Sequence, residues 1–130
     1  MILTRRALAP LFGALALAPL PTVAADKRKF TDAAFEAAVK AGGPVFVEVH
    51  APWCPTCKQQ APHIARLLAD PRFRNIAAFS VDFDSQKDAL RRLNASKQST
   101  LIVFKGGKEL DRSVGDTDGQ TITMLMETLL

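Results

Sequence analysis

Cys54 and Cys57 are the residues of this sequence whose type and spacing point most directly to chemistry. They are the only cysteines in the chain of 130 residues, and they lie in the run Trp53-Cys54-Pro55-Thr56-Cys57-Lys58. A disulfide between residues three positions apart closes almost no loop, so it adds little to stability through chain entropy. The spacing therefore indicates a pair that forms and breaks a disulfide rather than a structural crosslink.

The residues around the pair give each cysteine a different role. A β-rich run ends at His50, and a helix is expected from about Cys54 to Ala69. A thiol at a helix N-terminus faces unpaired N–H groups and the positive end of the helix dipole, and both favour the thiolate. We therefore expect Cys54, partly exposed, to be the attacking thiol. Cys57, one turn further in, would attack the mixed disulfide that Cys54 forms.

Three further residues near the pair are candidates for a role in catalysis. Pro55 fixes the backbone between the cysteines, and Thr56 offers a hydroxyl to a sulfur. Glu48 interrupts a strand that is otherwise apolar, and acids are seldom buried without a partner or a purpose. If Glu48 lies beneath the pair, it would relay a proton to or from Cys57. The structural alternative is an edge position in contact with water or with Lys58.

The hydrophobic pattern predicts an α/β domain that positions these residues. Helices are expected from Thr31 or Asp32 to Gly42, over 54–69 with Pro62 inside, over 87–93 with Ser85 as its cap, and from about Gly119 onward. Strands are expected over 44–50, 76–83, 100–104 and 109–114, the last two joined by a turn at Gly106-Gly107. Alternation that ends in a hairpin predicts a mixed central sheet, parallel with an antiparallel C-terminal hairpin and flanked by helices.

The first 25 residues predict export. Arg5-Arg6 precedes an apolar stretch over 7–20, and Val23-Ala24-Ala25 supplies small residues for cleavage before Asp26. We interpret 1–25 as a signal peptide, twin-arginine-like or general secretory, and 26–130 as the mature domain, which would be periplasmic or otherwise exported. A buried first helix and an uncleaved anchor are the alternatives. The segment contains two arginines and no acids, which leaves 15 basic and 13 acidic residues. A net charge of +2 does not favour nucleic acid as a partner.

The run from Ala51 to Lys58, followed by Ala61-Pro62, resembles the active-site segment of the thioredoxin family, and the likeness continues through 100–107 and Val114-Gly115. The resemblance implies the thioredoxin fold and exchange of disulfides with protein thiols and with an upstream electron donor or acceptor protein. We expect no bound cofactor, because the electrons travel in the cysteines, and no metal. We also expect no stable membrane insertion after signal cleavage, because no apolar run approaches the roughly 20 residues of a spanning helix. The substrate groove would be formed by Trp53, Pro55, Thr56, Ser99, Thr100, Val114 and Gly115.

The sequence departs from the family at several positions. Ser99 occupies the position of a cis-proline, and we expect a trans peptide there. Glu48 replaces a buried aspartate, and Ser80 stands where a lysine near that acid is common. Pro55-Thr56 is similar to the dipeptide of periplasmic reductants in cytochrome c maturation, so a dedicated reductant of that kind is one alternative function. A non-enzymatic metal or iron–sulfur binder that uses Cys54, Cys57 and Ser99 is another.

Overall fold

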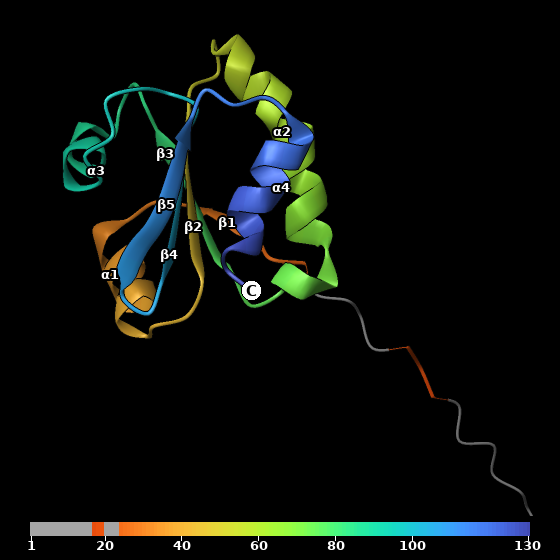
Figure 1. Cartoon of the computed structure of the whole chain (residues 1–130). Helices are drawn as coiled ribbons and strands as arrows, with labels where there is room; N and C mark the ends of the chain where they lie inside the picture. Colours follow the sequence, from red (N-terminus) through yellow and green to blue (C-terminus); the bar gives the residue numbers. More distant parts are fainter. Residues whose placement is uncertain (1–16, 20–23) are drawn as a thin grey trace, which may run out of the picture.

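A mixed five-stranded sheet forms the centre of the computed structural model, which describes residues 17–19 and 24–130 (Figure 1). The strand order is β1-β3-β2-β4-β5. The first three strands in that order are parallel, whereas β4 runs antiparallel to β2 and to β5. The strands are β1 (Lys27–Lys29), β2 (Val45–His50), β3 (Ala77–Asp82), β4 (Thr100–Lys105) and β5 (Lys108–Val114).

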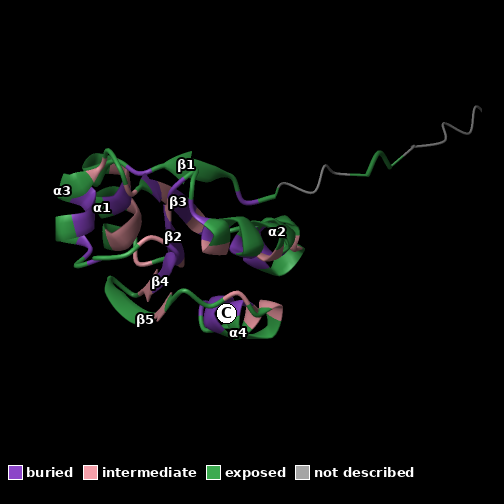
Figure 2. Ribbon diagram, turned by 90° about the horizontal axis from the view of Figure 1, so that it is seen from above, coloured by how far each residue is buried: buried purple, intermediate pink, exposed green. Residues whose placement is uncertain are grey.

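Helices cover both faces of this sheet, as Figure 2 shows. One face packs against α2 (Pro55–Ala69) and α4 (Gly119–Glu127), and the other against α1 (Asp32–Lys40) and α3 (Lys87–Arg92). A short 3₁₀ helix, η1 (Pro71–Phe73), follows α2. The central strand β2 is buried on both faces. Phe46 packs in the core between the sheet and the helices α2 and α4, whereas Val45, Val47 and Val49 pack in the core on the side of α1 and α3. This burial explains the apolar run in its sequence.

The predicted mixed sheet with a C-terminal hairpin is confirmed. The capping of α3 differs from the prediction: Ser85 is not the cap. Gln86 is the N-cap residue and makes no side-chain cap hydrogen bond. Its amide is used elsewhere, because Nε2 donates to the carbonyl oxygen of Phe30 at 2.8 Å and Oε1 accepts the N–H of Asp82 at 3.0 Å. Gln86 therefore ties the start of α3 to β3 and to the segment before α1.

The first strand was not predicted, because its three residues are all basic and have no apolar alternation. Arg28 lies 5.0 Å from the centroid of the Phe79 ring. Just before β1, Ala25 is buried and donates its N–H to the carbonyl oxygen of Leu68 at 3.0 Å. The edge strand is thus held by its pairing with β3 and by the contact of Arg28 with the Phe79 ring on that strand.

The predicted signal peptide, residues 1–25, lies mostly outside the described residues. Within 17–19 and 24–130, no helix has the length and apolar character that a membrane crossing needs.

Candidate active site

Cys54 occupies the N-cap position of α2, directly after the loop that follows β2. Its backbone is extended, and its Sγ accepts the N–H of Cys57 at 3.1 Å. Pro55 stands at the first helical position, where its missing N–H costs nothing. The two cysteines form a disulfide with a Cα–Cα distance of 5.3 Å. The helix N-terminus therefore directs the N–H of Cys57 at the sulfur of Cys54.

Both cysteines are buried in this oxidised state. Cys54 is 0% exposed and Cys57 is 4% exposed, so the expectation that Cys54 is partly exposed is wrong for the disulfide form. The physical reason is packing: the cysteines form a small apolar cluster with Ala51 against Phe83, and the hydroxyl of Ser99 covers the sulfurs. Approach of a partner to the pair therefore depends on the groups that surround it.

Trp53 is the exposed apolar group beside the pair, at 53% exposure. Its indole Nε1 donates to Oδ2 of Asp84 at 2.8 Å, and its ring meets Phe83 edge to face at 6.3 Å. The loop that carries Asp84 is ordered by Asp82, whose Oδ1 accepts the N–H groups of Asp84 and Ser85. These two hydrogen bonds hold the pKa of Asp82 below its usual range. These contacts thus hold the exposed Trp53 ring in one orientation beside the cysteine pair.

Ser99, the residue directly before β4, contacts the sulfur atoms of both cysteines. It is 3% exposed, and its Oγ lies 3.3 Å from Sγ of Cys54 and 3.7 Å from Sγ of Cys57. The peptide before Ser99 is trans, as predicted, and φ of Ser99 is +61°. The backbone N–H of Ser99 donates to the carbonyl oxygen of Val49 at 2.8 Å. At the position where the resembled family has a cis-proline, this protein therefore has a trans peptide and a backbone with positive φ.

The other predicted groove residues lie beside Ser99. Thr100 is buried, donates its hydroxyl to the carbonyl oxygen of Lys97 at 2.7 Å, and pairs across the hairpin with Val114. Val114 is 50% exposed. Gly115, with φ of +77°, donates its N–H to the carbonyl oxygen of Ser99 at 3.0 Å. At the helix end of the pair, Pro55 is exposed and Thr56 is half-buried.

Gln60 is a site residue that the sequence reasoning missed. It is 2% exposed, and its Nε2 donates to the carbonyl oxygens of Ser99 at 3.2 Å and Asp116 at 2.8 Å. The signal was available, because Gln60 lies three residues after Cys57 and four before Ile64 on the buried side of α2. An amide at such a position needs hydrogen-bond partners.

Glu48 is buried in the central strand, at 6% exposure, and forms an ion pair with Lys27, whose Nζ lies 2.6 Å from its carboxylate. The alternative of an edge position or a pair with Lys58 is therefore wrong. Its neighbour on β3 is Ser80, so the ammonium that faces the acid comes from β1, the unpredicted strand. Glu48 precedes Val49, whose carbonyl oxygen lies 3.9 Å from Sγ of Cys57.

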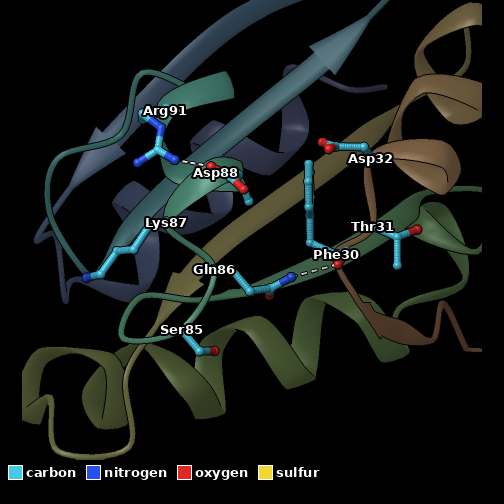
Figure 3. Close-up of a pocket in the computed structure, with 9 residues that line it drawn as sticks. Phe30, Thr31, Asp32, Ser85, Gln86, Lys87, Asp88 and Arg91 are labelled. Carbon is cyan, nitrogen blue, oxygen red and sulfur yellow. Dashed lines mark hydrogen bonds and ion pairs between the residues drawn. The ribbon is translucent and has the colours of Figure 1, made fainter.

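In the described part of the chain, the cysteine pair belongs to no cluster of metal-ligating side chains. Among residues 17–19 and 24–130, no three His, Cys, Asp or Glu side chains are grouped as metal ligands would be. The pocket in Figure 3 lies on the other side of the sheet, where the segment before α1 meets α3. Thr31, Ser85 and Lys87 are among the residues that line it, and neither cysteine is.

A mixed sheet with a Cys-Pro-Thr-Cys disulfide at the start of the helix after its central strand defines a thiol–disulfide oxidoreductase of the thioredoxin fold. The family model described as Thioredoxin matches residues 26–128. The chain belongs to the thioredoxin family.

Relatives and solved structures agree with this assignment. A thioredoxin of Chlamydia trachomatis is 35% identical over 86 residues, which cover 66% of this chain and 82% of the relative. Thioredoxin Asp f 29 of Aspergillus fumigatus is 34% identical over 67% of this chain and 81% of its own length. The crystal structure of Trxlp from Edwardsiella tarda superposes with a TM-score of 0.74 at 42% identity, over 77% of this chain and 98% of that one.

Proposed function

We propose that this protein exchanges disulfides with partner proteins in the periplasm, with Cys54 as the nucleophile and Cys57 as the resolving thiol. One observation carries the proposal: Sγ of Cys54 stands at the N-terminus of α2 and accepts the N–H of Cys57. A negative charge on that sulfur is stabilised by the N–H group and by the helix dipole. Such a sulfur is both a ready nucleophile and a good leaving group at neutral pH.

The reaction with an oxidised partner proceeds in two displacements. The Cys54 thiolate attacks one sulfur of the partner's disulfide, forms a mixed disulfide, and releases the other sulfur as a thiolate that takes up a proton. The Cys57 thiolate then attacks Sγ of Cys54, and the partner's second sulfur leaves. Two electrons pass to the partner, and the disulfide seen here remains. Run in reverse, the same steps oxidise a dithiol.

Glu48 is the proposed proton acceptor for Cys57. Glu48 forms an ion pair with Lys27, and a carboxylate can accept a proton. Cys57 faces the strand at the carbonyl oxygen of Val49, the residue after Glu48. The thiol of Cys57 loses its proton toward this carboxylate as it attacks the mixed disulfide, and the proton returns when the disulfide is next reduced.

The groove is the proposed docking site for the partner's chain. Trp53 and Val114 are exposed apolar side chains, and Ser99, Thr100 and Gly115 supply the backbone beside the sulfurs. An exposed apolar rim favours contact with the side chains that flank a partner's cysteine. The partners in this proposal are protein thiols and disulfides, together with one protein that returns the pair to its starting redox state.

Reduction of insulin disulfides with dithiothreitol as electron donor tests this function. Wild-type protein should accelerate the reaction well beyond dithiothreitol alone, and Cys54→Ser should abolish the acceleration. Asp88→Ala, at an exposed position of α3, is the control and should retain the wild-type rate. A wild-type rate equal to that of dithiothreitol alone would contradict the proposal.

Export is proposed from residues 1–25 and has a separate test. The full chain is produced in a bacterium, the periplasmic fraction is isolated, and the N-terminus of the protein is sequenced. Asp26 should be the first residue. Replacing Arg5 and Arg6 by lysine should block export if the twin-arginine route is used and should leave it intact if the general secretory route is used. Recovery of the uncleaved chain in the cytoplasm would contradict the export proposal.

A further inference from the structure

The Ser99 hydroxyl lies between the two sulfur atoms that exchange electrons. Its Oγ is 3.3 Å from Sγ of Cys54 and 3.7 Å from Sγ of Cys57, and Ser99 is 3% exposed. A disulfide sulfur is a weak acceptor, whereas a thiolate accepts a charge-assisted hydrogen bond. The contact with Cys54 therefore becomes stronger when the disulfide is reduced and the thiol ionises.

Backbone contacts hold Ser99 in a conformation that serine rarely adopts. Its φ is +61°, and a residue other than glycine keeps such an angle only where its surroundings enforce it. Here the N–H of Ser99 donates to Val49, and its carbonyl oxygen accepts from the N–H of Gly115 and from Nε2 of Gln60. These bonds fix the direction in which the side chain leaves the backbone, and that direction is toward the sulfurs.

Gln60 connects three parts of the site. It belongs to α2, the helix that begins at the cysteine pair, and the same amide nitrogen reaches the carbonyl oxygens of Ser99 and Asp116. At 2% exposure, an apolar residue in its place would leave two carbonyl groups without that donor. The amide thus sets the distance between the helix and the Ser99 backbone.

We infer that Ser99 is a catalytic residue whose hydroxyl donates a hydrogen bond to the Cys54 thiolate, and that Gln60 is a positioning residue that holds Ser99 there. The inference rests on the proposed function, in which that thiolate is the nucleophile. The proton stays on Oγ of Ser99 throughout, and no bond at Ser99 is made or broken. The hydrogen bond raises the ionised fraction of Cys54 at a given pH and favours the reduced protein over the disulfide.

Alkylation of the reduced protein with iodoacetamide, followed at each cysteine by mass spectrometry across pH, tests the role of the hydroxyl. Ser99→Ala and Ser99→Gly both remove it but differ in backbone effect, because only glycine accepts a positive φ without strain. At pH values below the midpoint of the Cys54 titration, both variants should have an ionised fraction of Cys54 about tenfold lower than that of wild type. Ser96→Ala, in the same loop and exposed, should keep the wild-type profile. An unchanged pH profile of Cys54 alkylation in both variants would overturn the inference. So would profiles that shift in opposite directions in the two variants, in parallel with their changes in stability.

Equilibration of the same variants with glutathione gives a second, independent readout. Loss of the hydrogen bond should favour the disulfide about tenfold, which corresponds to a reduction potential about 30 mV more negative. A potential equal to that of wild type in both variants would also count against the inference. Neither measurement uses a protein substrate, so failure of insulin reduction and failure of this inference are separate outcomes.

Gln60→Leu tests the positioning role, with Gln59→Leu, on the exposed side of the same helix, as the matched control. The Cys54 profile should shift in Gln60→Leu in the same direction as in Ser99→Ala, and the double variant should shift no further than Ser99→Ala alone. Gln59→Leu should leave the profile unchanged. If Gln60→Leu lowers stability but leaves the profile unchanged, Gln60 supports the fold only and the positioning role is wrong.

Discussion

The N–H of Ser99 donates to the carbonyl oxygen of Val49 at 2.8 Å, and this bond joins the segment before β4 to the end of β2. A proline cannot make this bond and cannot adopt the φ of +61° found at Ser99. The proline that is usual in the family would therefore break this hydrogen bond and change the backbone conformation beside the cysteines.

The first prediction is that Ser99→Pro destabilises the protein, although proline is the residue common at this position in the family. The buried carbonyl of Val49 loses its donor and the backbone must change φ, at a combined cost of about 2–4 kcal/mol. Urea unfolding of the oxidised protein measures the change. Ser99→Gly is the control and should be at least as stable as wild type. A Ser99→Pro protein as stable as wild type would show that the observed backbone is not required.

The second prediction concerns the ion pair between β1 and β2. Lys27→Met should lower the free energy of unfolding by about 1–2 kcal/mol, because it leaves the buried carboxylate of Glu48 without its cation. The cost is reduced from that of a fully buried pair because the Lys27 side chain is 36% exposed. Lys29→Met, two residues along the same strand, is the control. In a double-mutant cycle with Glu48→Gln, the two changes should couple. Independent effects would contradict the pairing.

The third prediction separates chemistry from stability at Glu48. Glu48→Gln keeps the size of the side chain and removes its ability to accept a proton, so the release of a mixed disulfide by Cys57 should slow by about tenfold or more. The slowing should be greatest at low pH, where few Cys57 thiols ionise unaided. Rapid-mixing measurements of release across pH would show this. A release rate and pH profile equal to those of wild type would eliminate the proton-transfer role.

The fourth prediction uses Trp53, which is the only tryptophan of a chain that has no tyrosine. Asp84→Ala removes the acceptor of the indole N–H, so the fluorescence anisotropy of Trp53 should fall. Stability should change by less than about 1 kcal/mol because the bond is exposed. KM for a protein disulfide should rise while kcat stays constant, since docking rather than chemistry is affected. Asp88→Ala should change none of these values, and an unchanged anisotropy in Asp84→Ala would contradict the orienting role of Asp84.

Most of the fold could be predicted from the sequence because periodicity and turn residues are local signals. Apolar runs mark β2 and β4, and Gly106-Gly107 marks the hairpin that joins β4 to β5. The strand β1 could not be predicted. Its three basic residues form a strand only because the edge of β3 is available to them, and that is a tertiary effect.

The site was predictable in part for the same reason. The positions of Cys54 and Cys57 follow from a strand, a loop and a helix in sequence order. The partners of Glu48 and Ser99 do not, because Lys27 and Gln60 reach them across the fold, from 21 and 39 residues away in sequence. The sequence indicates that Gln60 is a polar residue on the buried face of α2, but only the fold identifies the carbonyl groups to which its amide donates.

The most direct test of the account is covalent trapping of partner proteins by the two cysteine variants. Cys57→Ser should accumulate mixed disulfides through Cys54, because the thiol that resolves them is missing, while Cys54→Ser should accumulate none. Each variant is expressed with its full N-terminus, the cells are acid-quenched, and complexes that disappear on reduction are identified by mass spectrometry, with the linked cysteine assigned. The account predicts partner peptides joined to Cys54 in Cys57→Ser alone. Equal recovery of complexes from both variants, or partner peptides joined to Cys57 in Cys54→Ser, would contradict the assigned roles.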